Sequence, residues 1–158
     1  HIPEASAYHD QYLEKRASEY GHDVRARLEL GRFILATDYL KAQQARRVFI
    51  RDFRKLFRKV DVLITPSSPI AAPKRGVERV PFNGQETDVR LVMSRLSRPF
   101  NLTGSPAISL PCGFTRDGLP IGLQIVGDLF DEATVLKVAH SYEANTDWKT
   151  RRPPIGPG

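Results

Sequence analysis

Serine and histidine side chains are the groups in this sequence whose chemistry suits nucleophilic catalysis. The serines in question lie in segments rich in proline and glycine, at positions Ser67, Ser68, Ser105 and Ser109. The histidine, His140, lies in a segment whose apolar residues have helical spacing. A catalytic serine needs a base within hydrogen-bonding reach and a third group that orients the base. None of these serines stands in a Gly-x-Ser-x-Gly elbow. We therefore expect His140 to be a surface side chain, and no residue of this chain to act as a catalytic acid, base or nucleophile.

Cysteine and histidine could also support redox or metal chemistry. Cys112 stands between Pro111 and Gly113, where we expect a sharp reversal of the chain. A reactive thiolate needs cationic neighbours or a helix N-terminus, and the local sequence offers neither, so this cysteine is predicted to be buried and inert. The histidines at 1, 9, 22 and 140 lack ligand spacing and no second cysteine exists. The sequence thus predicts neither a metal site nor a cofactor.

The single cysteine also bears on the compartment. It excludes an internal disulfide and is typical of a reducing environment. The sequence has no signal-peptide-like start and no apolar run of about 18 residues, the length that would cross a membrane. We expect a cytoplasmic protein without membrane contact.

Positive charge is concentrated in the first part of the chain. The net charge is +6, and residues 1–60 hold 13 Lys/Arg against 8 Asp/Glu. An apolar stripe at helical spacing runs through Ala42, Ala45, Phe49, Phe53, Leu56 and Val60. It predicts an amphipathic helix that starts after Asp38, with one core face and one basic face.

The basic helix 41–59 suggests an alternative, non-enzymatic function as a module that binds nucleic acid or an acidic partner. Such binding would depend on salt. Asp38 and Asp52 interrupt the basic face, however, and no aromatic side chains interleave with its exposed positions. We interpret it as a solvated face, or as one buried against a missing part of a larger protein, and expect no nucleic-acid partner.

The elements that would position these groups form one α/β segment with a helical first half. Residues 2–19 are expected to be helical, and Val24, Leu28, Gly31 and Leu35 recur on one face of a following helix. Strands are predicted at 61–65, which should be buried, at 107–111 and at 121–126. A helix should follow them. Asp131 is its expected N-cap, and Val135, Val138, Ala139 and Tyr142 recur at helical spacing along it. Residues 76–86 lack periodicity and are predicted to be a loop, residues 91–96 a short helix, and residues 151–158 a tail. Domain bounds are thus 1–60 helical and 61–150 α/β.

Five stretches of the sequence resemble the C-terminal part of amidase signature enzymes. They are LELGRFILATDYLKAQQARR (28–47), VDVLITPSSPIAAP (60–73), NLTGSPAISLPCGF (101–114), DGLPIGLQIVG (117–127) and FDEATVL (130–136). The resemblance covers nearly the whole chain except residues 74–90. It implies a mixed β-sheet covered by α-helices that is shared with an N-terminal part of the same fold.

The same resemblance implies a parent that hydrolyses carboxylic amides of small molecules through a Ser–cis-Ser–Lys triad. The Gly/Ser-rich segment that carries those serines does not occur here and would precede His1. We therefore expect the chain to be the C-terminal portion of an amidase, inactive alone, whose partner is the missing N-terminal part. The sequence leaves open whether the chain forms a homo-oligomer.

Three residues acquire a substrate-binding role from this resemblance. In glutamine-using members, a basic residue in the helix before L-x-L-G holds the substrate carboxylate, and Arg27 falls near that place; the alternative is a solvated helix charge. Asn101 and Thr103 would shape the pocket, unless their role is structural. Those members also carry an aspartate seven residues before the Asn of the NLxG motif, where this chain has Ser94. This departure favours a general amidase over the alternative, the A subunit of a tRNA-dependent amidotransferase.

Overall fold

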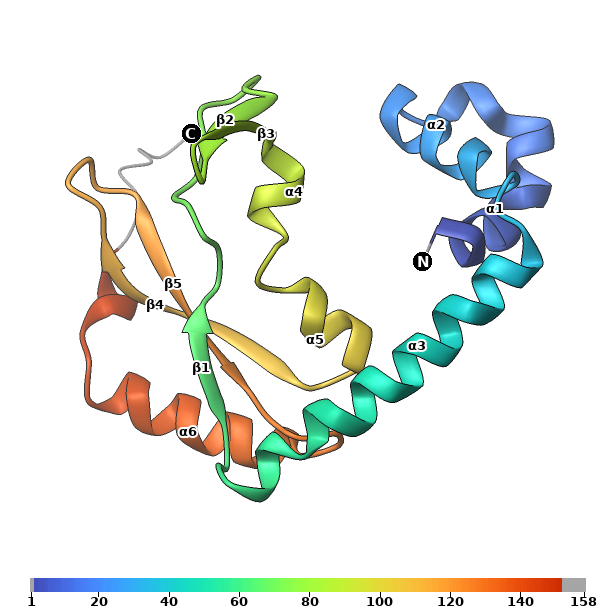
Figure 1. The fold of residues 1–158 in the computed structure, drawn as a ribbon. Coiled ribbons are helices and arrows are strands. Elements are labelled where there is room, and N and C mark those ends of the chain that lie inside the picture. The colour runs from blue at the N-terminus through green and yellow to red at the C-terminus, as the bar shows by residue number, and fades with distance from the viewer. Residues whose placement is uncertain (1, 152–158) are drawn as a thin grey trace. The chain divides into compact units, whose positions relative to one another are not determined.

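The computed structural model describes residues 2–151. Two compact units follow one another along the chain, the first ending at Val48 and the second beginning at Phe49 (Figure 1). The first is entirely helical and the second combines helices with strands. The predicted α/β class with a helical first half is therefore confirmed. Of the predicted tail 151–158, residues 152–158 lie outside the described residues.

Helices α1 (Ile2–Arg16) and α2 (His22–Gly31) pack closely in the first unit, with a 3-10 turn (Ala17–Glu19) between them. The Ser6 hydroxyl oxygen of α1 lies 2.6 Å from the Leu28 carbonyl oxygen of α2. A Cβ atom at Gly31 would come within 2.8 Å of the Ile2 carbonyl oxygen, so glycine is required at this crossing. The predicted stripe is only half right. Leu28 and Gly31 are buried, but Val24 is exposed, and Leu35 lies beyond the end of α2.

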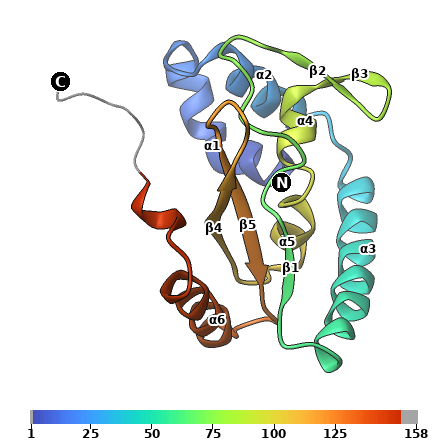
Figure 2. The same cartoon turned by 90° about the vertical axis from the view of Figure 1, so that its left-hand side faces the viewer.

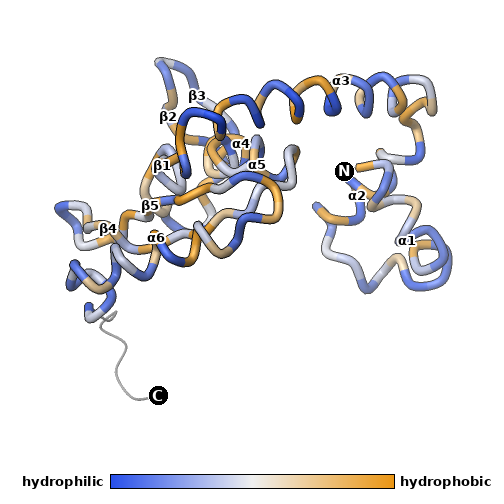
Figure 3. Tube along the Cα trace, turned by 90° about the horizontal axis from the view of Figure 1, so that it is seen from below, coloured by the Kyte–Doolittle hydropathy of each residue, from blue (hydrophilic) through white to orange (hydrophobic). Residues whose placement is uncertain are grey.

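Helix α3 (Ala36–Arg54) is the long amphipathic helix, and a 3-10 turn (Leu56–Arg58) follows it. It starts three residues earlier than expected because the Leu35 carbonyl accepts the first hydrogen bonds, from the amides of Asp38 and Tyr39. Apolar and polar residues alternate along it (Figure 3). Yet no residue of α3 is buried by other parts of residues 2–151, so the predicted core face is wrong for the chain as described.

Three strands form an antiparallel sheet in the order β1-β5-β4. Their bounds are Leu63–Pro66 for β1, Ala107–Phe114 for β4 and Pro120–Val126 for β5. Helix α6 (Glu132–Ala144) covers one face, while α4 (Val89–Met93) and α5 (Arg98–Thr103) lie on the other (Figures 1 and 2). The core on the α6 side consists of Leu110, Ile125, Val135 and Ala139. The three predicted strands and the capped helix are confirmed, Asp131 accepting a hydrogen bond from the Thr134 amide.

Two details of this sheet differ from expectation. Strand β4 continues through Pro111 because a shift of register between Pro111 and Gly113 absorbs Cys112 as a bulge. The predicted chain reversal there is therefore wrong, and the thiol is only partly buried. Strand β1 lies at an edge, which leaves Ile64 60% exposed instead of buried.

Residues 76–86, predicted to be a loop, contain most of a hairpin. Strands β2 (Arg79–Phe82) and β3 (Gln85–Asp88) pair antiparallel. Asn83 and Gly84 connect them with φ angles of 51° and 77°, as a tight type I′ turn requires.

Helix α5 was also not predicted. Pro99 stands in its first turn, and Gly104, with a φ of 80°, ends it. The 3-10 turn Trp148–Thr150 completes the described elements.

No helix between residues 2 and 151 is both long enough and apolar enough to span a membrane.

Candidate functional site

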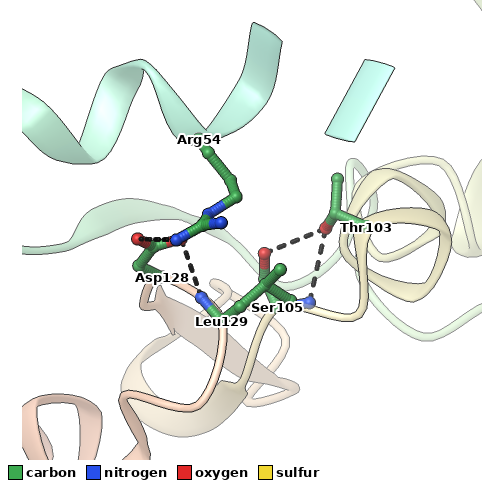
Figure 4. Close-up of polar contacts among 5 residues, drawn as sticks. All are labelled: Arg54, Thr103, Ser105, Asp128 and Leu129. Atoms are coloured by element: carbon green, nitrogen blue, oxygen red, sulfur yellow. Dashed lines mark hydrogen bonds and ion pairs between the residues drawn. The ribbon is translucent and has the colours of Figure 1, made fainter. Parts of the chain in front are cut away.

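The loop after α5 holds a buried hydroxyl network. Thr103 is only 3% exposed, and its Oγ1 lies 3.1 Å from the Phe100 carbonyl oxygen and 2.9 Å from Ser105 Oγ (Figure 4). The Ser105 amide also points to this oxygen, at 3.4 Å. These bonds fix the turn from α5 into β4 at Gly104. The predicted pocket role of Thr103 stays a prediction, and the geometry gives this residue a structural role as well.

A row of polar side chains crosses the sheet on the face opposite α6. Gln124 of β5 is buried, and its Nε2 donates to Thr65 Oγ1 at 3.0 Å and to the Leu96 carbonyl oxygen at 3.2 Å. Next to it, the hydroxyl oxygens of Ser67 and Ser109 lie 2.5 Å apart. Gly122 makes room for this pair, since a Cβ there would come within 2.6 Å of Ser67 Oγ.

Within residues 2–151, neither serine of this pair forms a hydrogen bond with a basic side chain. His140 is exposed on α6, which packs on the other face of the sheet. The proximity of Ser67 and Ser109, which are 42 residues apart in sequence, was not predicted. It depends on the register that places β1 and β4 on either side of β5, and a single sequence does not give that register.

An ion pair joins the end of α3 to the loop between β5 and α6. Arg54 Nε donates to Asp128 Oδ1 at 3.1 Å, and the Leu129 amide donates to the same oxygen at 2.8 Å (Figure 4). Burial raises the pKa of the Asp128 carboxyl, but the hydrogen bonds from Arg54 and Leu129 outweigh it and hold the pKa below its ordinary value. Neither residue was among the sequence-predicted site residues.

The remaining predicted positions are dispersed. Arg27 is exposed on α2 in the first unit, whereas Asn101 is exposed on α5 in the second. Their substrate-binding roles stay predictions. Ser94 ends α4, and its hydroxyl donates to the Arg90 carbonyl oxygen at 2.6 Å. Across residues 2–151, no three metal-ligating side chains gather in one place.

Comparison with known proteins gives one family. The model of the amidase family matches residues 3–136. The A subunit of glutamyl-tRNA(Gln) amidotransferase from Synechococcus sp. is 45% identical over 150 residues, which are 92% of this chain and 28% of that protein. The corresponding subunit of Thiobacillus denitrificans is 40% identical over 157 residues, which are 96% of this chain and 31% of that protein.

Solved structures give the same match. A structure described as an amidase superimposes with a TM-score of 0.86 at 30% identity, covering 92% of this chain and 33% of the other. The A subunit of the glutamyl-tRNA(Gln) amidotransferase from Thermotoga maritima superimposes with a TM-score of 0.55 at 28% identity, over the same shares of the two chains. This chain therefore spans about a third of the length of the relatives it matches.

Proposed function

Because the chain belongs to the amidase family, we propose that it is the C-terminal part of an amidase that hydrolyses carboxylic amides of small molecules. The observation that carries this proposal is the family match over residues 3–136, together with the superposition on an amidase structure at a TM-score of 0.86. In the proposed reaction a serine attacks the amide carbonyl, and a bridging serine and a lysine transfer protons. Backbone N–H groups stabilise the oxyanion.

The catalytic triad in this proposal belongs to another part of the same fold. Two surfaces of the chain are suited to receive that part. The outer edge of β4, eight residues long, pairs with no strand among residues 2–151, and an unpaired edge is a template for strand addition. The apolar stripe of α3 is likewise not buried by the described chain. We propose that both are covered in the complete enzyme, where this chain completes the sheet and forms one wall of the acyl pocket.

The A subunit of a tRNA-dependent amidotransferase is the second candidate. The curated relatives described above favour it, since they are subunits of this kind, with 45% and 40% identity. Ser94 favours the general amidase. An ammonium group is held by a carboxylate, and the Ser94 hydroxyl is neutral and already bonded to the Arg90 carbonyl.

Two measurements on the protein from its native source test the proposal. The first is the intact mass, which we expect to be roughly threefold above the 17.8 kDa of this chain. The second is hydrolysis of simple aliphatic and aryl amides in the absence of tRNA, for which we expect release of the amine. Activity that requires glutamine and a charged tRNA would favour the amidotransferase. Inactivity towards both kinds of substrate would contradict the two candidates alike.

A cytoplasmic location is part of the proposal. It is supported by the single cysteine, Cys112, which is unpaired and typical of a reducing compartment.

A further inference from the structure

A pocket of about 450 Å³ lies at the end of α3, and its wall is mostly cationic. The residues that line it are Arg51, Arg54, Lys55, Phe57, Arg58 and Asp128. All of them belong to the second unit. The volume is in the range of small-molecule sites.

Two carboxylates hold three of the cations in place. Asp52 accepts a hydrogen bond from Lys55 Nζ at 2.7 Å and another from Arg51 Nε at 3.2 Å. These bonds, the one from Lys55 foremost, lower the pKa of the Asp52 carboxyl. Asp128 accepts a hydrogen bond from Arg54 Nε at 3.1 Å. These ion pairs restrain the Arg51, Arg54 and Lys55 side chains, although all three remain more than half exposed.

Arg58 differs from the other cations of the pocket. Within the described part of the chain, its guanidinium has neither a hydrogen bond nor an ion pair with a side chain. Four cations face two carboxylates, counting Asp52, so the pocket retains two positive charges. A dianionic phosphate neutralises that excess, whereas a single carboxylate neutralises half of it.

We propose that this pocket binds the phosphate group of a small molecule, with Arg58 as its bidentate ligand. A guanidinium presents parallel N–H donors that match two phosphate oxygens. Phe57 supplies one apolar wall for the rest of the ligand. A small molecule fits better than a nucleic acid because the cations converge on one concavity, while Asp38 and Asp52 interrupt the charge along the helix. The inference does not depend on the proposed amidase function.

Calorimetric titration of the purified chain with inorganic phosphate and with phenyl phosphate tests this site. We expect saturable binding that weakens with added salt. Arg58→Gln removes the unpaired guanidinium and should weaken phosphate binding by roughly tenfold or more. Arg58→Lys keeps the positive charge but lacks the paired N–H donors of the guanidinium, so it should weaken phosphate binding by less than Arg58→Gln does. Arg47→Gln is the matched control. It changes the same charge on α3 outside the pocket lining, and we expect it to leave binding unchanged.

Three results would overturn the proposal. The first is the absence of binding of both probes at millimolar concentration. The second is binding that Arg58→Gln leaves intact while circular dichroism shows that the variant is folded. The third concerns fluorescence anisotropy with a labelled single-stranded RNA. If only RNA binds, and Arg58→Gln and Arg47→Gln weaken it equally, the basic face attracts polyanions in general and the pocket is not a site.

Discussion

Single hydroxyl groups determine how the segment around α5 is built. Thr103 is buried and bonded to the Phe100 carbonyl and to Ser105, while Asn101, two residues earlier, is exposed. Asn101 and Thr103, both in the NLTG motif, therefore differ in burial and in role. One stabilises the turn from helix to strand, and the other is available to a ligand or to another part of the fold.

Replacing Thr103 by valine should separate these roles. The Thr103→Val variant keeps the shape of the side chain but removes the hydroxyl that bonds the Ser105 amide and the Ser105 hydroxyl. The Phe100 carbonyl loses one of its two donors and keeps the Gly104 amide. We expect a loss of about 1–2 kcal/mol in the free energy of unfolding, measured by urea denaturation. The control Asn101→Ala should change it by no more than about 0.5 kcal/mol. Equal effects of the two substitutions would contradict the structural role of Thr103.

The Arg54–Asp128 pair should make stability depend on pH. The pKa of the Asp128 carboxyl is lowered in the folded chain, so its contribution is complete above the unfolded value of about 3.9. That contribution disappears as the pH falls through the lower, folded pKa. Asp128→Asn should therefore cost about 0.5–1 kcal/mol at pH 7, and the difference from the unmodified chain should vanish in acid.

Chemical denaturation from pH 7 to pH 3 measures this difference. Asp117→Asn, in the exposed turn between β4 and β5, is the control, and we expect a constant small effect. A cost of Asp128→Asn that stays unchanged down to pH 3 would show that the ion pair does not stabilise the fold.

At the scale of elements, close helix packing depends on one glycine. Gly31→Ala would place a Cβ 2.8 Å from the Ile2 carbonyl oxygen and 2.9 Å from Ser6 Cβ, so α1 and α2 would have to separate. We expect a loss of about 1–3 kcal/mol, seen as faster amide hydrogen exchange in α1 and a lower melting temperature. The matched control is Gly21→Ala, where the nearest atom would be 3.5 Å away. Unchanged exchange in Gly31→Ala would contradict this packing.

The elements also show how far the sequence predicts the structure. Local signals were sufficient where an apolar run or a cap decides the outcome, as in β5 and at Asp131. The Asn83-Gly84 hairpin was missed although its turn residues are a strong local signal. The bulge at Cys112 and the Arg54–Asp128 pair, 74 residues apart, arise from register and tertiary packing. A local pattern in a single sequence does not predict contacts that depend on strand register or on the packing of distant segments.

Burial of α3 was predicted wrongly for a related reason. The stripe through Phe49 and Phe53 has the correct period for a buried face, but burial depends on what packs against it. Phe53 contacts Phe57 and Phe100, with ring centroids 5.6 and 5.9 Å apart, while Phe49 remains 40% exposed. The pattern indicates a face that can be buried, and the described chain does not bury it.

At the scale of the whole molecule, the chain spans about a third of its relatives and its sequence lacks the Gly/Ser-rich run that carries the family's nucleophile. The serines that the structure brings together, Ser67 and Ser109, bond to each other, while His140 is exposed on α6 on the other face of the sheet. We therefore propose that this chain contributes to the sheet and the pocket wall of an amidase and that another segment carries out the chemistry.

An amide-hydrolysis assay of the purified 158-residue chain tests this account most directly. We predict that the chain releases no amine from a simple aryl amide above the rate of a heat-denatured sample, at neutral pH and at high protein concentration. Turnover that persists through purification and disappears in a Ser109→Ala variant would contradict the account, because it would place the nucleophile within this chain.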